Sequence, residues 1–144
     1  MLLQMAADGM GDRTAVGPLD AGLTMADLAS RAARAGTYLA SLPGERVALI
    51  DLNSEAVPLA LFGAALAGKP FVPINYRLTD EQLRALVART APATVIVGAG
   101  IAERLGTIDG IQVLDRSEFV EQTADESIEP ADPYAGDPDS IAVL

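Results

Sequence analysis

Short aliphatic runs that alternate with helical patterns constrain the fold of this chain more than any other feature. RVALID (46–51) and ATVIVG (93–98) contain no polar alternation, as expected of strands that are buried on both faces. FVPI (71–74) and IQVL (111–114) are predicted as two further strands. Strands that alternate with helices in this order are typical of right-handed parallel crossover units. The sequence therefore predicts an α/β fold with a parallel Rossmann-like sheet and flanking helices.

Three helices are predicted around these strands. Thr24 is a good N-cap, and apolar residues recur after it at steps of three and four. Asn53 is predicted to cap a second helix that runs to about Leu66, with Pro58 distorting its first turn. The third helix, DEQLRALVART, follows the Thr-x-x-Gln pattern of a capping box at 79–82.

Pro70 and Pro73 flank Phe71 and Val72 in the second predicted strand, which begins at Pro70. Neither proline can donate a backbone hydrogen bond. We therefore expect this strand to lie at a sheet edge, or to hold Pro73 at a non-bonding or irregular position.

The amino-acid composition excludes several classes of function. A chain of 144 residues with 50% hydrophobic content has room for one domain with a core, but not for a second complete domain. Cysteine and histidine are both absent, which excludes disulfides, thiolate metal sites and histidine-dependent catalysis. No apolar run reaches the roughly 20 residues of a membrane span, and the opening residues do not form a secretion signal. The cytoplasm is the expected compartment.

The net charge of −10 is concentrated near the end of the chain. Residues 1–102 hold 9 acids and 8 bases, whereas residues 103–144 hold 11 acids and 2 bases. Because the chain has no basic stripe, nucleic acid and anionic membrane surfaces are not expected partners.

The run 117–139 contains eight acids, three prolines and no base. This composition predicts an extended surface connection without a core of its own. Its acids lack the spacing and the glycine of a calcium loop, so a solvated linker is favoured over a metal site. The predicted organisation is an α/β subdomain at 1–116, an acidic proline-containing linker at 117–139, and the start of a strand at 140–144.

The run VIVGAG partly matches a dinucleotide-binding fingerprint, because Gly98 and Gly100 follow a strand and Asp115 ends the next one. In that fingerprint a third small residue lets the helix pack on the strand, but Glu103 occupies this position here. Gly106 also cuts the following helix short. A plain tight turn is therefore favoured over a cofactor site.

Lys69 is the only lysine, which makes it a candidate catalytic residue. No acid or second amine accompanies it in the sequence, and AGKP lacks the glycine spacing and the hydroxyl of a P-loop. A solvated lysine at the edge of a loop is the favoured interpretation.

Five segments, taken in order, resemble the start of the adenylate-forming, AMP-binding enzymes, and most closely the acyl-CoA synthetases or fatty-acid CoA ligases. The segments are LLQMAADGMGDRTAV, LTMADL, GERVALIDLNSEAVPLALFGAALAGKPFVPINYRLTDEQLRALV, ATVIVG and DPDSIAVL. The resemblance spans nearly the whole chain, and ALAGKPFVPIN followed by YRLT is its strongest part. It implies the first part of the large N-terminal domain of that fold, with IAVL leading to a phosphate-binding loop.

For the complete enzyme, the resemblance implies a two-step reaction. A carboxylic acid, with fatty acids as the leading class, reacts with ATP and Mg²⁺ to give an acyl-adenylate, and CoA then takes the acyl group. The family motifs that bind ATP and carry the catalytic lysine are absent from residues 1–144. The resemblance therefore assigns no catalytic, cofactor-binding or metal-binding residue to this chain, and ATP, Mg²⁺ and CoA are not expected to bind well to it.

Two residues depart from the family pattern, since Met25 replaces a common aromatic residue and Pro58 interrupts a usually continuous helix. The PIN.RL form favours CoA ligases over adenylation domains that deliver to a carrier protein. Substrate choice is set further along the family's chain, so the resemblance does not specify the acid.

Three hypotheses stay open at this point. The first is the N-terminal piece of an acid-CoA ligase, inactive as it stands. The second is a free-standing α/β module that binds a nucleotide or a partner through the VGAG turn. The third is a non-catalytic remnant that acts through its surface, for example by pairing its exposed sheet edge with a partner or with itself.

Overall fold

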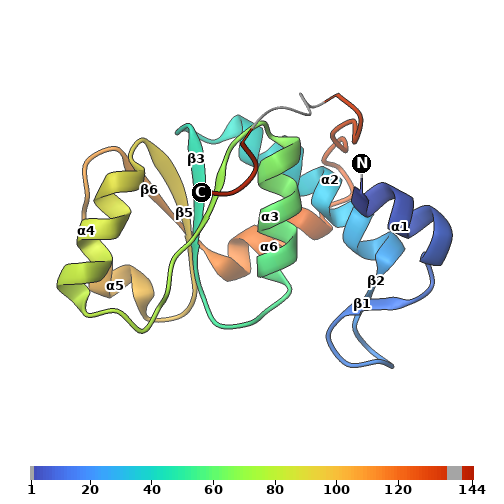
Figure 1. The fold of residues 1–144 in the computed structure, drawn as a ribbon, viewed down its shortest axis with the longest axis horizontal. Coiled ribbons are helices and arrows are strands. Elements are labelled where there is room, and N and C mark those ends of the chain that lie inside the picture. Colours follow the sequence, from blue (N-terminus) through green and yellow to red (C-terminus); the bar gives the residue numbers. More distant parts are fainter. Residues whose placement is uncertain (1, 136–140) are drawn as a thin grey trace.

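A four-stranded parallel sheet forms the centre of the molecule in this computed structural model, which describes residues 2–135 and 141–144 (Figure 1). Strand β3 pairs in parallel with both β4 and β5, and β5 pairs in parallel with β6. In spatial order the strands are β4 (Phe71–Pro73), β3 (Arg46–Ile50), β5 (Ala93–Val97) and β6 (Ile111–Asp115). The predicted α/β fold with a parallel sheet is confirmed.

Helices cover both faces of this sheet (Figure 1). One face carries α2 (Met25–Ser41), α3 (Ala56–Leu66) and α6 (Arg116–Ala124). The other face carries α4 (Asp80–Thr90) and α5 (Ile101–Leu105). The remaining elements lie beside α2 and are α1 (Leu2–Met10) and a hairpin of β1 (Thr14–Val16) and β2 (Leu23–Thr24), none of which was predicted.

The central strands are buried on both sides, which explains why their sequences show no polar alternation. All five residues of β5 are buried. In β3, Val47 and Leu49 face the core under α2 and α3, whereas Ala48 and Ile50 face the core under α4. Each strand residue thus has an apolar environment, and a continuous aliphatic run results.

Helices α2 and α3 approach each other closely because glycines lie at their contact. A Cβ atom on Gly63 would lie 2.6 Å from Cβ of Ala35, and one on Gly36 would lie 2.7 Å from Cβ of Leu66. Both separations are shorter than a normal carbon–carbon contact of about 3.5–4.0 Å. The glycines at this contact therefore allow α2 and α3 to pack tightly without large aromatic side chains between them.

Two of the predicted helix starts are confirmed. The Thr24 side chain accepts a hydrogen bond from Asp27 N, and the Asp27 carboxylate accepts one from Thr24 N, which completes a capping box on α2. The hydrogen bonds of the Thr24 side chain and backbone lower the pKa of Asp27. Thr79 and Gln82 form the corresponding capping box on α4.

The predicted start of α3 is wrong. The helix begins at Ala56, and the side-chain bond to its first turn comes from Ser54, whose Oγ accepts from Ala56 N at 3.3 Å, and not from Asn53. Pro58 is consequently the third residue of the helix. A backbone N–H at this position has no intrahelical acceptor, so proline removes no helix hydrogen bond there.

The expectation of an extended connection from residue 117 is wrong for residues 117–124, because they belong to α6. Phe119 and Thr123 of this helix are buried, and Phe119 packs in the core shared with α2 and α3. A single aromatic side chain on an acidic helix therefore gives this segment the core contact that its composition does not predict.

The end of α6 and the segment after it are held along α2 by hydrogen bonds to backbone carbonyls. Arg34 Nε donates to Thr123 O in α6 at 2.9 Å, and Thr37 Oγ1 donates to Glu129 O in the following segment at 2.7 Å. Ala131 N also donates to a carbonyl of α2, at 3.0 Å. The described part of the acidic run is thus attached to the domain. Residues 136–139 of that run, and residue 140 of the predicted last strand, lie outside the described residues.

Strand β4 lies at the edge of the sheet, as its two prolines predict. On its outer side Phe71 N donates to Ala142 O at 2.8 Å, and Leu144 N donates to Phe71 O at 2.9 Å. Val143 forms an isolated parallel bridge with Phe71. Residues 142–144 therefore pair with β4, although Ile141, Val143 and Leu144 remain more than half exposed.

Candidate functional site

The carboxyl ends of the parallel strands are the place where open α/β sheets bind ligands. At this edge Asp51 follows β3, Gly98 follows β5 and Arg116 follows β6. The Asp51 side chain is 2% exposed, and its Oδ1 lies 3.1 Å from Arg116 Nη1. Ser54 Oγ donates to the other carboxylate oxygen of Asp51 at 2.7 Å. These contacts join the ends of β3 and β6 across β5.

Gly98 makes room for this ion pair. A Cβ atom at position 98 would overlap Oδ1 of Asp51 and lie 3.1 Å from its Cγ. Only a glycine at the end of β5 leaves the carboxylate of Asp51 in contact with both Arg116 and Ser54. Gly98 is part of the partial dinucleotide fingerprint, but the space beside it is occupied by the Asp51 side chain of the protein itself.

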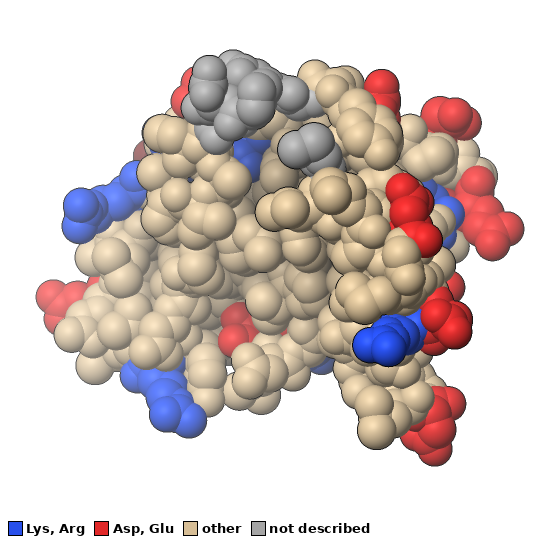
Figure 2. Space-filling view, turned by 45° about the vertical axis from the view of Figure 1, so that its right-hand side comes forward, with Lys and Arg blue, Asp and Glu red and all other residues tan. Residues whose placement is uncertain are grey.

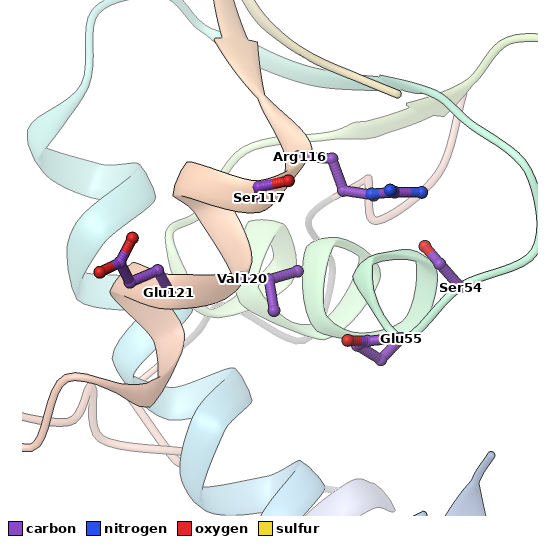
Figure 3. Close-up of a pocket in the computed structure, with 6 residues that line it drawn as sticks. All are labelled: Ser54, Glu55, Arg116, Ser117, Val120 and Glu121. Atoms are coloured by element: carbon purple, nitrogen blue, oxygen red, sulfur yellow. The ribbon is translucent and has the colours of Figure 1, made fainter. Parts of the chain in front are cut away.

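A pocket of about 400 Å³ lies beside the ion pair, between the starts of α3 and α6 (Figure 3). Arg116 reaches from the start of α6 towards the loop that carries Ser54 (Figure 3). The pocket has one arginine, which is already paired, and two carboxylates, and its lining residues are Ser54, Glu55, Arg116, Ser117, Val120 and Glu121. Neither serine has a histidine or lysine beside it that could act as a base. The lining can hold a small polar group.

The other two residues of the partial fingerprint, Gly100 and Asp115, are helix N-caps. Gly100 has a φ of 76° and forms the N-cap of α5, which is five residues long and ends at Gly106. Asp115 accepts a hydrogen bond from Ser117 N at 2.7 Å and so caps α6. The interpretation of VGAG as a tight turn is confirmed.

Lys69 is not the solvated lysine that the sequence suggests. Its Nζ donates to Leu39 O at 2.8 Å and to Leu42 O at 2.7 Å, at the carboxyl end of α2. The last carbonyls of a helix lack intrahelical partners, and a cation near them is favourable. Partial burial lowers the pKa of the Lys69 amine. Lys69 therefore joins the turn before β4 to α2, a structural role.

Sequence reasoning missed Arg104, which holds the turn between β4 and α4. Its guanidinium donates to Tyr76 O at 3.0 Å and to Leu78 O at 2.6 Å, and its Nε lies 2.7 Å from Asp80 Oδ1. The arginine is more than 20 residues away from this turn in the sequence, so no local pattern indicates the contact. These contacts connect α5 to the NYRLT turn.

Basic side chains on the face shown in Figure 2 stand as separate groups among acidic ones and form no stripe there. Among residues 2–135 and 141–144, no cluster of three or more carboxylates is arranged to hold a metal ion. No helix in that part of the chain has the length and apolar content needed to cross a membrane.

Comparisons with known proteins agree with the fold and identify the family. The family model for AMP-binding enzymes matches residues 3–144. The chain is 36% identical over 77 residues to feruloyl-CoA synthase of an Amycolatopsis species, a match that covers 51% of this chain and 16% of that protein. It is 36% identical over 81 residues to the long-chain-fatty-acid–CoA ligase FadD13 of Mycobacterium tuberculosis, which covers 56% of this chain and 16% of that protein.

Two solved structures share the fold over almost the whole chain. The N-terminal domain of FACL13 from Mycobacterium tuberculosis matches with a TM-score of 0.78 and 26% identity, covering 99% of this chain and 40% of that one. The nonribosomal peptide synthetase FmoA3 matches with a TM-score of 0.77 and 26% identity, covering 98% of this chain and 15% of that one. The chain spans about a sixth of the length of the two curated relatives, for which the covered share is 16%.

Proposed function

The chain belongs to the family of AMP-binding enzymes, and from this premise we propose that it is the first part of the large N-terminal domain of an acid-CoA ligase. The complete enzyme activates a carboxylic acid with ATP and Mg²⁺ to an acyl-adenylate and transfers the acyl group to CoA. The observation that carries the proposal is the family match over residues 3–144, almost the entire chain.

In this proposal residues 1–144 act as scaffold. Acyl-adenylate formation requires cations and hydrogen-bond donors around the phosphates, and a site that excludes water from a reactive anhydride. At the carboxyl edge of the described sheet, the cation nearest the pocket is Arg116, which is paired with Asp51. We therefore assign the binding of ATP, Mg²⁺ and CoA to residues outside this segment.

The names of the curated relatives support CoA as the acceptor. Feruloyl-CoA synthase and FadD13 are both named as enzymes that form a CoA thioester, one with an aromatic acid and the other with long-chain fatty acids. The match to FmoA3 supports the alternative, an adenylation domain that delivers its acid to a carrier protein. Fatty and aromatic acids are therefore the first two substrate classes to test.

The acceptor is tested with the full-length protein that contains this segment. We expect ATP, Mg²⁺, CoA and one acid from a panel of fatty and aromatic acids to give an acyl-CoA and AMP, both detected by mass spectrometry. The control replaces CoA with a carrier protein that bears phosphopantetheine. Acyl loading of the carrier without any acyl-CoA would replace the CoA-ligase proposal with the adenylation-domain alternative. Absence of AMP formation with every acid and both acceptors would contradict both.

A further inference from the structure

Strand β6 forms the edge of the sheet opposite to β4. The outer side of β4 pairs with residues 142–144, whereas no segment within the described residues pairs with the outer side of β6. Proteins usually protect such an edge with lysine, proline or a β-bulge, because its free backbone groups attract other strands. The sequence of β6, IQVLD, contains no lysine or proline, and its register with β5 is regular. Strand β6 is therefore an unprotected edge.

The hydrogen-bond pattern of the sheet shows which residues of β6 direct their backbone groups outward. Ala93 N donates to Gly110 O at 3.0 Å, and Ala93 lies opposite Ile111 in the register of β5 and β6. In a parallel pair a residue bonds to the two neighbours of the residue opposite it, so the even-numbered residues of β6 bond to β5. The backbone groups of Ile111, Val113 and Asp115 consequently point away from the sheet.

These outward groups are arranged symmetrically about Val113, the central residue of β6. When two copies of β6 lie antiparallel with Val113 opposite Val113, each Val113 N–H can donate to the C=O of the other. Each Asp115 N–H can likewise donate to the C=O of Ile111 in the other copy. The N–H of Ile111 is not needed, since it already donates to Ile108 O at 3.2 Å. The edge is therefore complementary to itself over its full length.

The side chains of β6 also favour the antiparallel pairing. Val113 is 38% exposed, and the pairing would bring the two valines together and remove apolar surface from water. Asp115 would lie opposite Ile111 of the second copy, whereas a parallel pairing in register would place two aspartates opposite each other. Like charges directly opposite each other are destabilising. Charge therefore favours the antiparallel orientation, which has twofold symmetry.

We propose that β6 pairs with β6 of a second copy of this chain, in the antiparallel register centred on Val113. The two sheets then form one continuous sheet across a twofold axis. Two strands of five residues give an interface at the small end of the range for protein complexes, so the dimer is weak. The proposal goes beyond the ligase function, and its test measures association alone. Its failure would leave the ligase proposal unaffected, and the reverse also holds.

Sedimentation equilibrium of the 144-residue chain between about 0.02 and 2 mM tests the association. We expect the mean mass to rise with concentration from that of a monomer towards that of a dimer. Amide hydrogen exchange measured by NMR at both ends of this range tests the register. The amides of Val113 and Asp115 should exchange about threefold more slowly in the concentrated sample. The amides of Gln112 and Leu114, which bond to β5, should change less.

Two variants test the role of Val113. Val113→Pro removes an N–H that points outward, so it blocks the pairing without removing a bond between β6 and β5. Val113→Lys places two positive charges opposite each other across the twofold axis. Each is expected to weaken association by about tenfold or more.

Leu86→Lys is the matched control, because Leu86 is also 38% exposed but lies on α4, away from the edge. It should leave the association constant within about twofold. Thermal unfolding of all three variants checks that they fold. The full-length protein that contains this segment, with and without Val113→Lys, is measured in the same way and should show the same difference.

Three results would overturn the proposal. The first is a monomer over the whole concentration range, and the second is equal weakening of association by Val113→Lys and Leu86→Lys. The third is a dimer of the 144-residue chain that the full-length protein does not form, which would show that another part of the protein covers β6.

Discussion

Replacement of Phe119 with alanine is expected to lower the free energy of unfolding by about 3–5 kcal/mol. Phe119 is the largest fully buried side chain and belongs to the core formed with α2 and α3. The neighbouring helices already pack closely through small residues such as Gly63 and Ala35, so they have little freedom to fill the cavity. Urea unfolding followed by circular dichroism measures the loss.

Glu121→Ala is the matched control, because Glu121 is an exposed residue on the same helix. Its effect on the free energy of unfolding should stay within about 0.5 kcal/mol. A cost below about 1 kcal/mol for Phe119→Ala would show that α6 contributes little to the core. Residues 117–124 would then behave as the linker that their acidic composition suggests.

Gly98→Ala is expected to cost about 2–4 kcal/mol of unfolding free energy. The added methyl group would displace the carboxylate of Asp51 from Arg116 and Ser54. A buried carboxylate that loses its partners is costly, although the side chain of Arg116 is 34% exposed and so reduces the effect. Urea unfolding of the variant gives the value.

A double-mutant cycle with Asp51→Ala tests whether displacement of the Asp51 carboxylate causes the loss of stability in Gly98→Ala. Without the carboxylate the methyl group meets no obstacle, so Gly98→Ala should cost less than about 1 kcal/mol in the Asp51→Ala background. Gly9→Ala is the control, since a Cβ atom at Gly9 meets no other atom within 4 Å. Equal costs of Gly98→Ala in the two backgrounds would contradict the proposed steric relation between Gly98 and Asp51.

The sheet was predictable because its strands are buried on both faces. Burial on both faces requires an unbroken aliphatic run, and RVALID and ATVIVG each provide one. The starts of α2 and α4 were predictable for a different reason, since a capping box is a local pattern of side chains and backbone groups four residues long. Both signals lie within a short stretch of sequence.

The features that were missed depend on contacts between distant parts of the chain. Helix α6 packs on the core through Phe119 and receives hydrogen bonds from the arginines of α2, contacts that its acidic composition does not indicate. Lys69 caps a helix that ends nearly 30 residues before it, and Arg104 holds a turn more than 20 residues before it. No local spacing distinguishes these side chains from solvated ones.

The candidate site was only partly visible in the sequence. The sequence singled out Gly98 only as part of a partial dinucleotide fingerprint, whereas in the structure this glycine leaves room for the carboxylate of Asp51. The ion pair of Asp51 with Arg116 joins residues 65 positions apart, and no pattern in the sequence links them. The family assignment rests on the match over residues 3–144, and not on the charges at this site.

The measurement that tests the central claim most directly is acid-dependent exchange of pyrophosphate into ATP, with Mg²⁺ present, by the 144-residue chain and by the full-length protein that contains it. Our account predicts background exchange for the chain alone, because we assign the phosphate-binding groups to residues outside it. It predicts exchange above background for the full-length protein with a fatty or aromatic acid. Acid-dependent exchange by residues 1–144 alone would contradict the assignment of this segment as scaffold.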